Sequence, residues 1–242
     1  MDLILEFLII FLLIIFQSMF GIGLLLFGTP TFLLLGYDFA STLVLLLPIS
    51  ISISFLQITH QKISMNSLIK EFNLYCLPFL VLFLIVTINL GQIINIKIYV
   101  SILLIVSSMA VLINNKIIFI NKYLLNYRKF FLIIIGSIHG FTNMGGGFLS
   151  IFSTLINNNN RVLTRSYISY GYLIMGIFQY MTLLFLGLSN IDFIKLFYIP
   201  LVLLLFYPSQ NFFNNLNDKL FIEVINYTAL TFGVIALIVS LK

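Results

Sequence analysis

The strongest constraint in this sequence is a series of long stretches that contain no charged side chain. Asp, Glu, Lys and Arg are all absent from residues 7–37, 39–61, 72–96, 98–115, 130–160, 166–191, 196–217 and 224–241. A helix needs about 20 apolar residues to cross a bilayer, and in lipid a helix satisfies its own backbone hydrogen bonds. The pattern predicts an all-α membrane protein with about eight transmembrane helices.

The composition excludes an ordinary soluble domain. Only 8% of the residues are charged and 61% are hydrophobic, whereas a soluble domain carries about 25% charged residues. The formal net charge is +5, but the basic residues lie in short gaps between apolar runs, as membrane-surface anchors do. We therefore expect a lipid bilayer around the protein and no nucleic-acid partner. The single cysteine, Cys76, is expected to be a buried, unreactive thiol.

Two of the uncharged stretches, 7–37 and 130–160, are too long for one straight membrane helix. At about 1.5 Å per residue, a helix of either length would overshoot a hydrocarbon core of about 30 Å. Both contain glycines near the middle, Gly21 and Gly23 in the first and residues 145–147 in the second. Helices break or kink readily at glycine. Each stretch is therefore predicted to be an interrupted helix, either kinked or partly re-entrant.

The two halves of the chain show signs of an internal repeat. One offset relates Gln57 to Gln179, and a slightly longer offset relates the two glycine clusters. We predict two tandem four-helix repeats, residues 1–122 and 123–242, each beginning with a glycine-interrupted helix, within one membrane domain. Four full crossings per repeat would make the repeats parallel, whereas an odd number, caused by a re-entrant segment, would make them inverted.

The distribution of Lys and Arg predicts an orientation. If every stretch crosses the membrane and the N-terminal end is inside, internal loops contain more of these residues than external loops. Cytoplasmic loops are enriched in Lys and Arg, so both termini are expected in the cytoplasm. The acidic start of the chain and the external positions of Arg161 and Arg165 argue against this orientation.

The second glycine cluster lies among polar residues that are unusual inside a membrane span. A helix break after His139 and Asn143 would expose amide N–H groups at the positive end of the following helix, which suits an anion. Broken helices near the midplane form substrate sites in many transporters. Gly136 and Gly140, four residues apart, also fit a simple packing face. His139 fits an anion site, a proton site or a neutral side chain bonded to a neighbouring helix.

Three further polar residues complete the candidate site. Gln57 and Gln179 lie late in the second helix of each repeat, where they either line a path or bond across helices. Arg165 begins the sixth stretch, where an arginine either attracts an oxyanion at a pore mouth or anchors the helix at the membrane surface. The predicted substrate-binding residues are Gly21, Gly23, Gln57, His139, Asn143, Gly145, Gly146, Gly147, Arg165 and Gln179.

Patterns that would indicate catalysis or metal binding are missing from the sequence. It contains no phosphate-binding loop motif, no paired carboxylates and no Cys/His cluster, so we predict no catalytic residue, cofactor or metal ion. The broken helices favour a carrier rather than an enzyme. An anion channel, a membrane-embedded enzyme and a non-transporting scaffold are the alternatives.

The glycine motifs resemble those of the sulfite exporter TauE/SafE family. That family has a glycine-rich stretch leading to a proline in its first helix, as Gly21, Gly23 and Pro30 do here, and a second glycine-rich copy in its second half. Two departures are Leu24 and Leu25, where many relatives carry glycines or small residues, and the lack of a proline soon after Gly147. The resemblance implies a secondary transporter of small anions such as sulfite or organosulfonates in a plasma (inner) membrane. It leaves the oligomeric state open.

Overall fold

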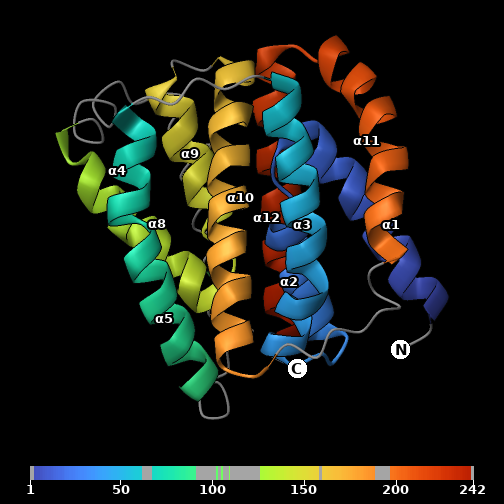
Figure 1. The fold of residues 1–242 in the computed structure, drawn as a ribbon. Coiled ribbons are helices and arrows are strands. Elements are labelled where there is room, and N and C mark those ends of the chain that lie inside the picture. Colours follow the sequence, from blue (N-terminus) through green and yellow to red (C-terminus); the bar gives the residue numbers. More distant parts are fainter. Residues whose placement is uncertain are drawn as a thin grey trace.

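The protein folds into helices throughout the part of the chain that the structure describes. This computed structural model describes residues 3–61, 67–90, 126–157, 160–188 and 197–240, with 102, 105 and 109 as single positions. The helices are α1 (Leu3–Phe20), α2 (Leu24–Leu34), α3 (Phe39–Gln61), α4 (Ser67–Tyr75), α5 (Leu77–Leu90), α8 (Arg128–Thr142), α9 (Gly146–Ile156), α10 (Arg161–Phe185), α11 (Tyr198–Asn215) and α12 (Asp218–Ser240). Figure 1 shows them as a bundle of roughly aligned helices.

Four spans are long and apolar enough to cross a membrane: Leu3–Phe20, Phe39–Gln61, Ile69–Leu90 and Arg161–Phe185. The predicted all-α class is confirmed for the described residues, and α3 coincides with the predicted stretch 39–61. The predicted span 98–115 lies almost entirely outside the described residues, as does the predicted repeat boundary at residue 122.

The span Ile69–Leu90 contains most of α4 and all of α5, and the two helices are separated only at Cys76. Pro78 explains the interruption, because proline has no amide hydrogen and its ring clashes with the carbonyl four residues earlier. Cys76 is fully buried and makes no disulfide, so the prediction of a buried thiol is confirmed.

The first glycine break, residues 21–23, reverses the chain. Gly21 and Gly23 have φ values of 79° and 139°, a region that only glycine enters readily. On either side, the Phe16 and Phe27 rings are 5.1 Å apart. Farther from the break, the Tyr37 hydroxyl donates to Glu6 Oε2 at 2.7 Å. α1 and α2 therefore form an antiparallel hairpin rather than one kinked helix.

The second break, residues 143–145, lies just before the place predicted from the glycine cluster, because Gly146 and Gly147 belong to α9. α8 ends because Asn143 takes a left-handed conformation (φ 61°) and donates its amide to His139 O at 2.7 Å, a common helix C-cap. α9 then packs antiparallel to α10, since Ser153 bonds to Thr164 O and Gly146 lies against Tyr172.

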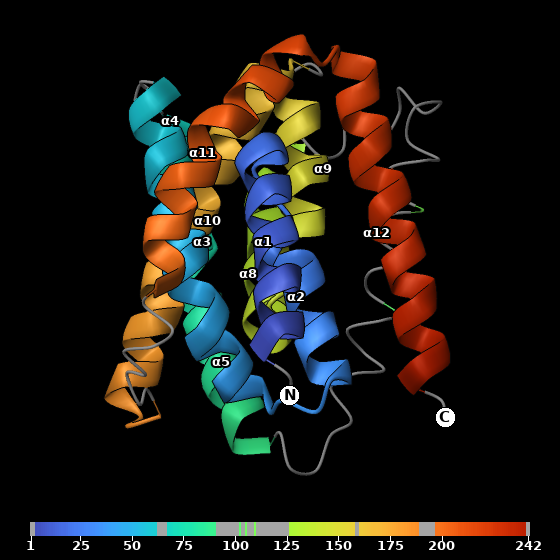
Figure 2. The ribbon, with the colours of Figure 1, turned by 90° about the vertical axis from the view of Figure 1, so that its right-hand side faces the viewer.

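Contacts along α1 fix its direction within the bundle. Tyr198 donates to Glu6 near the start of α1, and Gln210 donates to Ser18 O near its end, so α1 and α11 run in parallel. Figures 1 and 2 show both rising from the lower end, where the two termini lie. α3 also rises, whereas α10 descends.

The second hairpin points the other way. α8 runs parallel to the descending α5, because Gly136 lies against Cys76 O and Gly140 against Leu80 O. α9 then rises antiparallel to α10 (Figure 1). The α1–α2 hairpin therefore opens at the lower end of the bundle, and the α8–α9 hairpin opens at the upper end.

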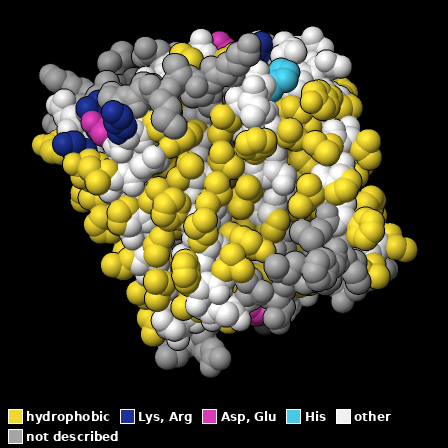
Figure 3. Space-filling view, in the orientation of Figure 1, with side chains coloured by type: hydrophobic (Ala, Val, Ile, Leu, Met, Phe, Trp, Pro, Cys, Tyr) yellow, Lys and Arg dark blue, Asp and Glu magenta, His cyan; other side chains and the backbone are white. Residues whose placement is uncertain are grey.

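Hydrophobic side chains cover the outside as well as the core. Phe185, Phe197, Leu204 and Leu3 are all more than two-thirds exposed. Figure 3 shows hydrophobic side chains across the whole height of one face, while the Lys and Arg side chains visible there lie at the upper end. An apolar wall with charges confined to the ends is typical of a protein surrounded by lipid.

Candidate functional site

Arg165 lies at the tip of the first hairpin, although it belongs to the second half of the sequence. It is 1% exposed. Its Cγ is 3.2 Å from the position that a Cβ on Gly21 would occupy. Of the two interpretations of Arg165 made from the sequence, the membrane-surface anchor is wrong, because the side chain is enclosed by protein. Glycine is favoured at position 21 mainly by its φ of 79°, and a side chain there would also require Arg165 to shift slightly.

The guanidinium of Arg165 is held by neutral groups. Nη2 donates to Ser18 O at 2.5 Å and to Gln210 Oε1 at 2.7 Å, and Cζ lies 4.0 Å from the centroid of the Phe213 ring. We refer to Arg165, Ser18, Gln210 and Phe213 as the Arg165 cluster. None of the ion pairs among the described residues includes Arg165, so its charge is buried beside neutral partners.

Two glutamines brace the same hairpin tip. Gln57 donates to Gln17 O at 2.7 Å and accepts a bond from Ser169 at 2.8 Å, which joins α3 to both α1 and α10. Gln17 Oε1 accepts the Leu24 amide at 3.2 Å and so takes one of the N–H groups that a helix start leaves unpaired. For Gln57, the prediction of a bond across helices is confirmed.

The second break has a different chemical lining. The Tyr172 hydroxyl lies 1.6 Å from the position that a Cβ on Gly146 would occupy, so a side chain at Gly146 has no room. Gly145, the N-cap of α9, supplies no side-chain acceptor. The Gly147 amide makes only a long contact of 3.3 Å to Met144 O. The first-turn amides of α9 therefore point from the helix start beside Tyr172.

Three predicted residues surround this helix start. His139 Nε2 is 3.2 Å from Gln179 Oε1, and the His139 and Tyr172 ring centroids are 5.9 Å apart. Asn143 Nδ2 donates to Thr29 Oγ1 of α2 at 2.8 Å. We refer to His139, Asn143, Tyr172 and Gln179 as the Tyr172 cluster. All four side chains are fully buried.

Buried polar atoms without a hydrogen-bond partner concentrate at the two breaks. Among the residues the structure describes, these atoms are Ser18 Oγ, Glu71 Oε2, His139 Nδ1, Asn143 Oδ1, Thr164 Oγ1, Arg165 Nε, Tyr172 Oη and Gln179 Nε2. Two belong to the Arg165 cluster and four to the Tyr172 cluster. Because nearly all buried polar groups in proteins are paired, this concentration makes both hairpin tips candidate sites for ordered water or a polar ligand.

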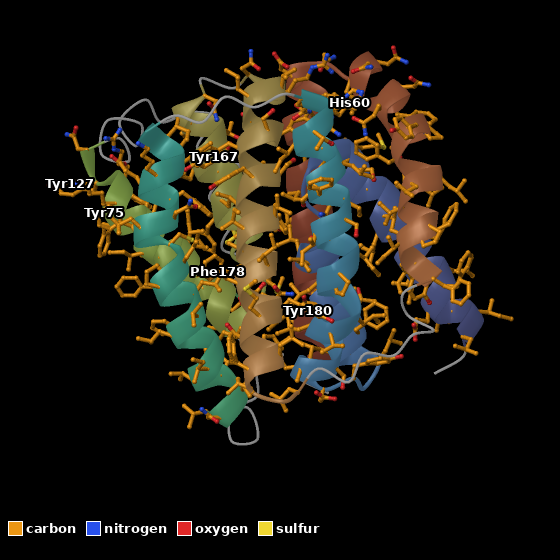
Figure 4. The ribbon with its side chains drawn as sticks, in the orientation of Figure 1. His60, Tyr75, Tyr127, Tyr167, Phe178 and Tyr180 are labelled. Carbon is orange, nitrogen blue, oxygen red and sulfur yellow. The ribbon has the colours of Figure 1, made fainter. Side chains whose placement is uncertain are left out.

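The two breaks lie at different levels of the bundle. Gly21 contacts Arg165 and Ser169, whereas the second break contacts Tyr172 and Gln179 farther along α10. In Figure 4, the labels of Tyr167 and Tyr180 mark these upper and lower levels of the helix. The structure thus separates the predicted residues into an upper group with Gly21, Gly23, Gln57 and Arg165, and a lower group with His139, Asn143, Gly145, Gly146, Gly147 and Gln179.

Sequence reasoning missed several residues that shape the two clusters. Gln17 could have been found, because it is an amide inside an apolar stretch and closely precedes Gly21. Gln210 had the same signal in a later stretch. Tyr172 had none, since tyrosine is common in this chain and only its contact with Gly146 distinguishes it.

Comparison with known proteins identifies no relative. No family model, no curated protein and no solved structure matches this chain. The function therefore has to be inferred from the residues and their geometry.

Proposed function

We propose that this protein is a secondary carrier of small anions, with sulfur-containing oxyanions and organosulfonates as the first substrate class to test. The observation that carries the proposal is Arg165, a buried guanidinium with neutral partners at the break of a membrane hairpin. Ionisable groups within membrane segments are rare and commonly functional. The sulfur-anion class follows the glycine motifs that resemble the TauE/SafE family, and the plasma (inner) membrane follows the same resemblance.

An anion would remove the main electrostatic cost of this arrangement. A charge buried without a counter-charge costs several kcal/mol, and an oxyanion beside Arg165 Nε would supply that counter-charge. Guanidinium groups bind planar or tetrahedral oxyanions through paired N–H bonds. Ser18 Oγ, which has no partner within the described chain, can donate a further bond. Gly21, Gly23 and Gln57 then shape the surroundings of the bound anion.

Reconstitution into liposomes tests this function. Purified protein is expected to exchange internal unlabelled sulfite for external radiolabelled sulfite, with a rate that saturates as the anion concentration rises. A rate that does not saturate and follows the membrane potential would indicate a channel. No flux of sulfite, thiosulfate, small sulfonates or carboxylates would favour a scaffold and would contradict the carrier.

The architecture suits alternating access, in which one repeat moves against the other. We infer that α1, α2, α3 and α4–α5 form one repeat and that α8, α9, α10 and α11 form a second, inverted repeat. Support comes from the opposite directions of the two hairpins and from Gln57 and Gln179. Each glutamine contacts the last turns of the broken helix in its own repeat, at Gln17 and His139.

The same geometry supports an orientation different from the one expected from the sequence. The described Lys and Arg residues all lie near the starts of descending helices: Lys70, Arg128, Lys129, Arg161, Arg165 and Lys219. They therefore lie toward the upper end, whereas Glu6 and Asp38 are at the lower end. By the positive-inside rule we propose that the upper end is cytoplasmic. This reverses the expectation that both termini are inside, which assumed that each glycine-containing stretch crosses the membrane.

Cysteine labelling in intact cells tests the hairpins and the orientation together. Cys76 is buried, so single cysteines can be added to the native sequence. Cysteines at Leu3 and Asp38, at the mouth of the first hairpin, are expected to react with a membrane-impermeant maleimide from outside. Cysteines at Tyr127 and Val162, at the mouth of the second, are expected to react only after permeabilisation. All four positions are exposed.

Each pair serves as a control for its own hairpin. If the two members of a pair react from opposite sides, that stretch crosses the membrane and is not a re-entrant hairpin. If the two members of each pair react from the same side, but each pair reacts from the side opposite to the one expected, the hairpins are supported and the proposed orientation is wrong. The unmodified protein should show no labelling in either condition.

A further inference from the structure

The Tyr172 cluster offers more hydrogen-bond donors than acceptors to a ligand. Tyr172 has an unpaired hydroxyl and Gln179 an unpaired amide nitrogen. Between Gly145 and Leu149, whose backbone bond begins α9, the Gly146 and Phe148 amides are first-turn N–H groups without intrahelical partners. Unpaired donors beside a helix N-terminus favour an anion.

Two acceptors accompany these donors. Asn143 Oδ1 is unpaired, because Nδ2 of that side chain is the atom that bonds to Thr29. When His139 donates from Nε2 to Gln179 Oε1, its unpaired Nδ1 is an acceptor. An oxyanion that keeps one O–H group would match this set, since its oxygens accept from the donors and its hydroxyl donates to Asn143 or His139.

The charge of the site limits the charge of its ligand. No Lys, Arg, Asp or Glu belongs to the cluster, and the start of a helix supplies only about half a positive charge. A doubly charged anion would remain largely uncompensated in this buried position, whereas a singly charged one is better matched. The Arg165 cluster differs in this respect, because it contains a full positive charge.

The two clusters are distinct in position as well as in charge. Arg165 and Tyr172 are seven residues apart on α10, which corresponds to about 10 Å along the helix. The two side chains also contact different breaks, because Arg165 lies against Gly21 and Ser18 of the first and Tyr172 lies against Gly146 of the second. An anion that crosses the bundle along α10 would meet the two clusters in succession.

We propose that the Tyr172 cluster and the first turn of α9 form a second anion site, specific for a small monovalent oxyanion that carries one proton. The inference rests on the proposed carrier function only for the class of ligand. Its position, donors and charge come from the second break alone. Hydrogen sulfite is the member of this class closest to the proposed substrates.

Equilibrium binding of radiolabelled sulfite to the detergent-purified protein tests the proposal. The wild type is expected to bind two anions per chain. Tyr172→Phe removes only a hydroxyl without a partner, so it is expected to weaken one of the two sites at least about tenfold, about 1.4 kcal/mol. The melting temperature without anion should stay equal or rise, because an unpaired buried polar atom is lost. Arg165→Met is expected to abolish the other site and spare the Tyr172 site.

The pattern across the variants separates this proposal from the carrier function. If the wild type binds one anion per chain and each variant abolishes that binding, the two clusters form a single shared site. That result would overturn the proposal of a second site. The proposal of a second site would also be overturned if the wild type binds one anion that is lost only in Arg165→Met, or if the wild type binds no anion. One site lost only in Tyr172→Phe would support the second site and contradict the role of Arg165.

Discussion

Replacing Arg165 with methionine is expected to reduce anion exchange in liposomes at least about 100-fold, which corresponds to about 3 kcal/mol of lost anion stabilisation. The methionine keeps most of the apolar volume of the side chain but supplies no charge. The folded protein should keep or gain stability, because a buried charge with neutral partners is removed. Ser18 O keeps a bond from Gln210 in the variant. The measurements are the exchange rate and the melting temperature of the same preparation.

Arg161 provides the matched control. It lies one turn before Arg165 on α10, but it pairs with Asp218 at 3.4 Å and bonds to Phe213 O at the edge of the bundle. A partly exposed ion pair contributes about 0–1 kcal/mol, so Arg161→Met should change exchange by less than about threefold. Equal losses in both variants would show that general positive charge, rather than the buried guanidinium, supports transport.

Alanine at Gly140 is expected to destabilise the folded protein strongly. Its Cβ would lie 2.2 Å from Leu80 O, and a Cβ at Gly136 would lie 2.1 Å from Cys76 O. These neighbours are backbone atoms, which cannot turn aside, so α8 and α5 would have to separate. Overpacking costs about 1–3 kcal/mol where side chains can adjust, and we expect about 3 kcal/mol or more here. Thermal unfolding in detergent measures the loss.

Gly36→Ala separates this clash from the ordinary effect of replacing glycine. No atom lies within 4 Å of a Cβ at Gly36, and only its φ of 95° opposes the change. Backbone strain of that kind costs about 1–2 kcal/mol. If Gly140→Ala is no worse than Gly36→Ala, the close approach of α8 and α5 does not stabilise the fold. The interpretation of Gly136 and Gly140 as a helix-packing face would then be wrong.

The positions of the helices and their breaks could be predicted from the sequence, but the chain reversal could not. Charge-free stretches locate α3 because lipid-exposed helices exclude charge along their whole length. The first glycine cluster locates its break for a local reason, the positive φ values of Gly21 and Gly23, whereas at the second break the left-handed residue is Asn143. Whether a broken helix continues or turns back depends on contacts between distant residues, such as Glu6 with Tyr37, and no local pattern encodes these.

The candidate site was predicted in part. Amide and imidazole side chains in apolar stretches are conspicuous, so Gln57, His139 and Gln179 could be selected. Arg165 was placed at a helix start, where sequence alone cannot distinguish a surface anchor from an enclosed side chain. Its enclosure depends on α1 and α11, which are far away in the sequence. Tyr172 becomes visible only through the three-dimensional contact with Gly146.

The Gln17 side chain would compete with any ligand for the backbone amide at the start of α2. Its carboxamide oxygen already accepts the Leu24 amide, while its nitrogen donates to Ser50 and Ser54 of α3. A ligand that bound the Leu24 amide would compete with this carboxamide, which also donates to Ser50 and Ser54. In the proposed carrier, ligand binding at the tip of the first hairpin would therefore also disturb the contacts of Gln17 with α3.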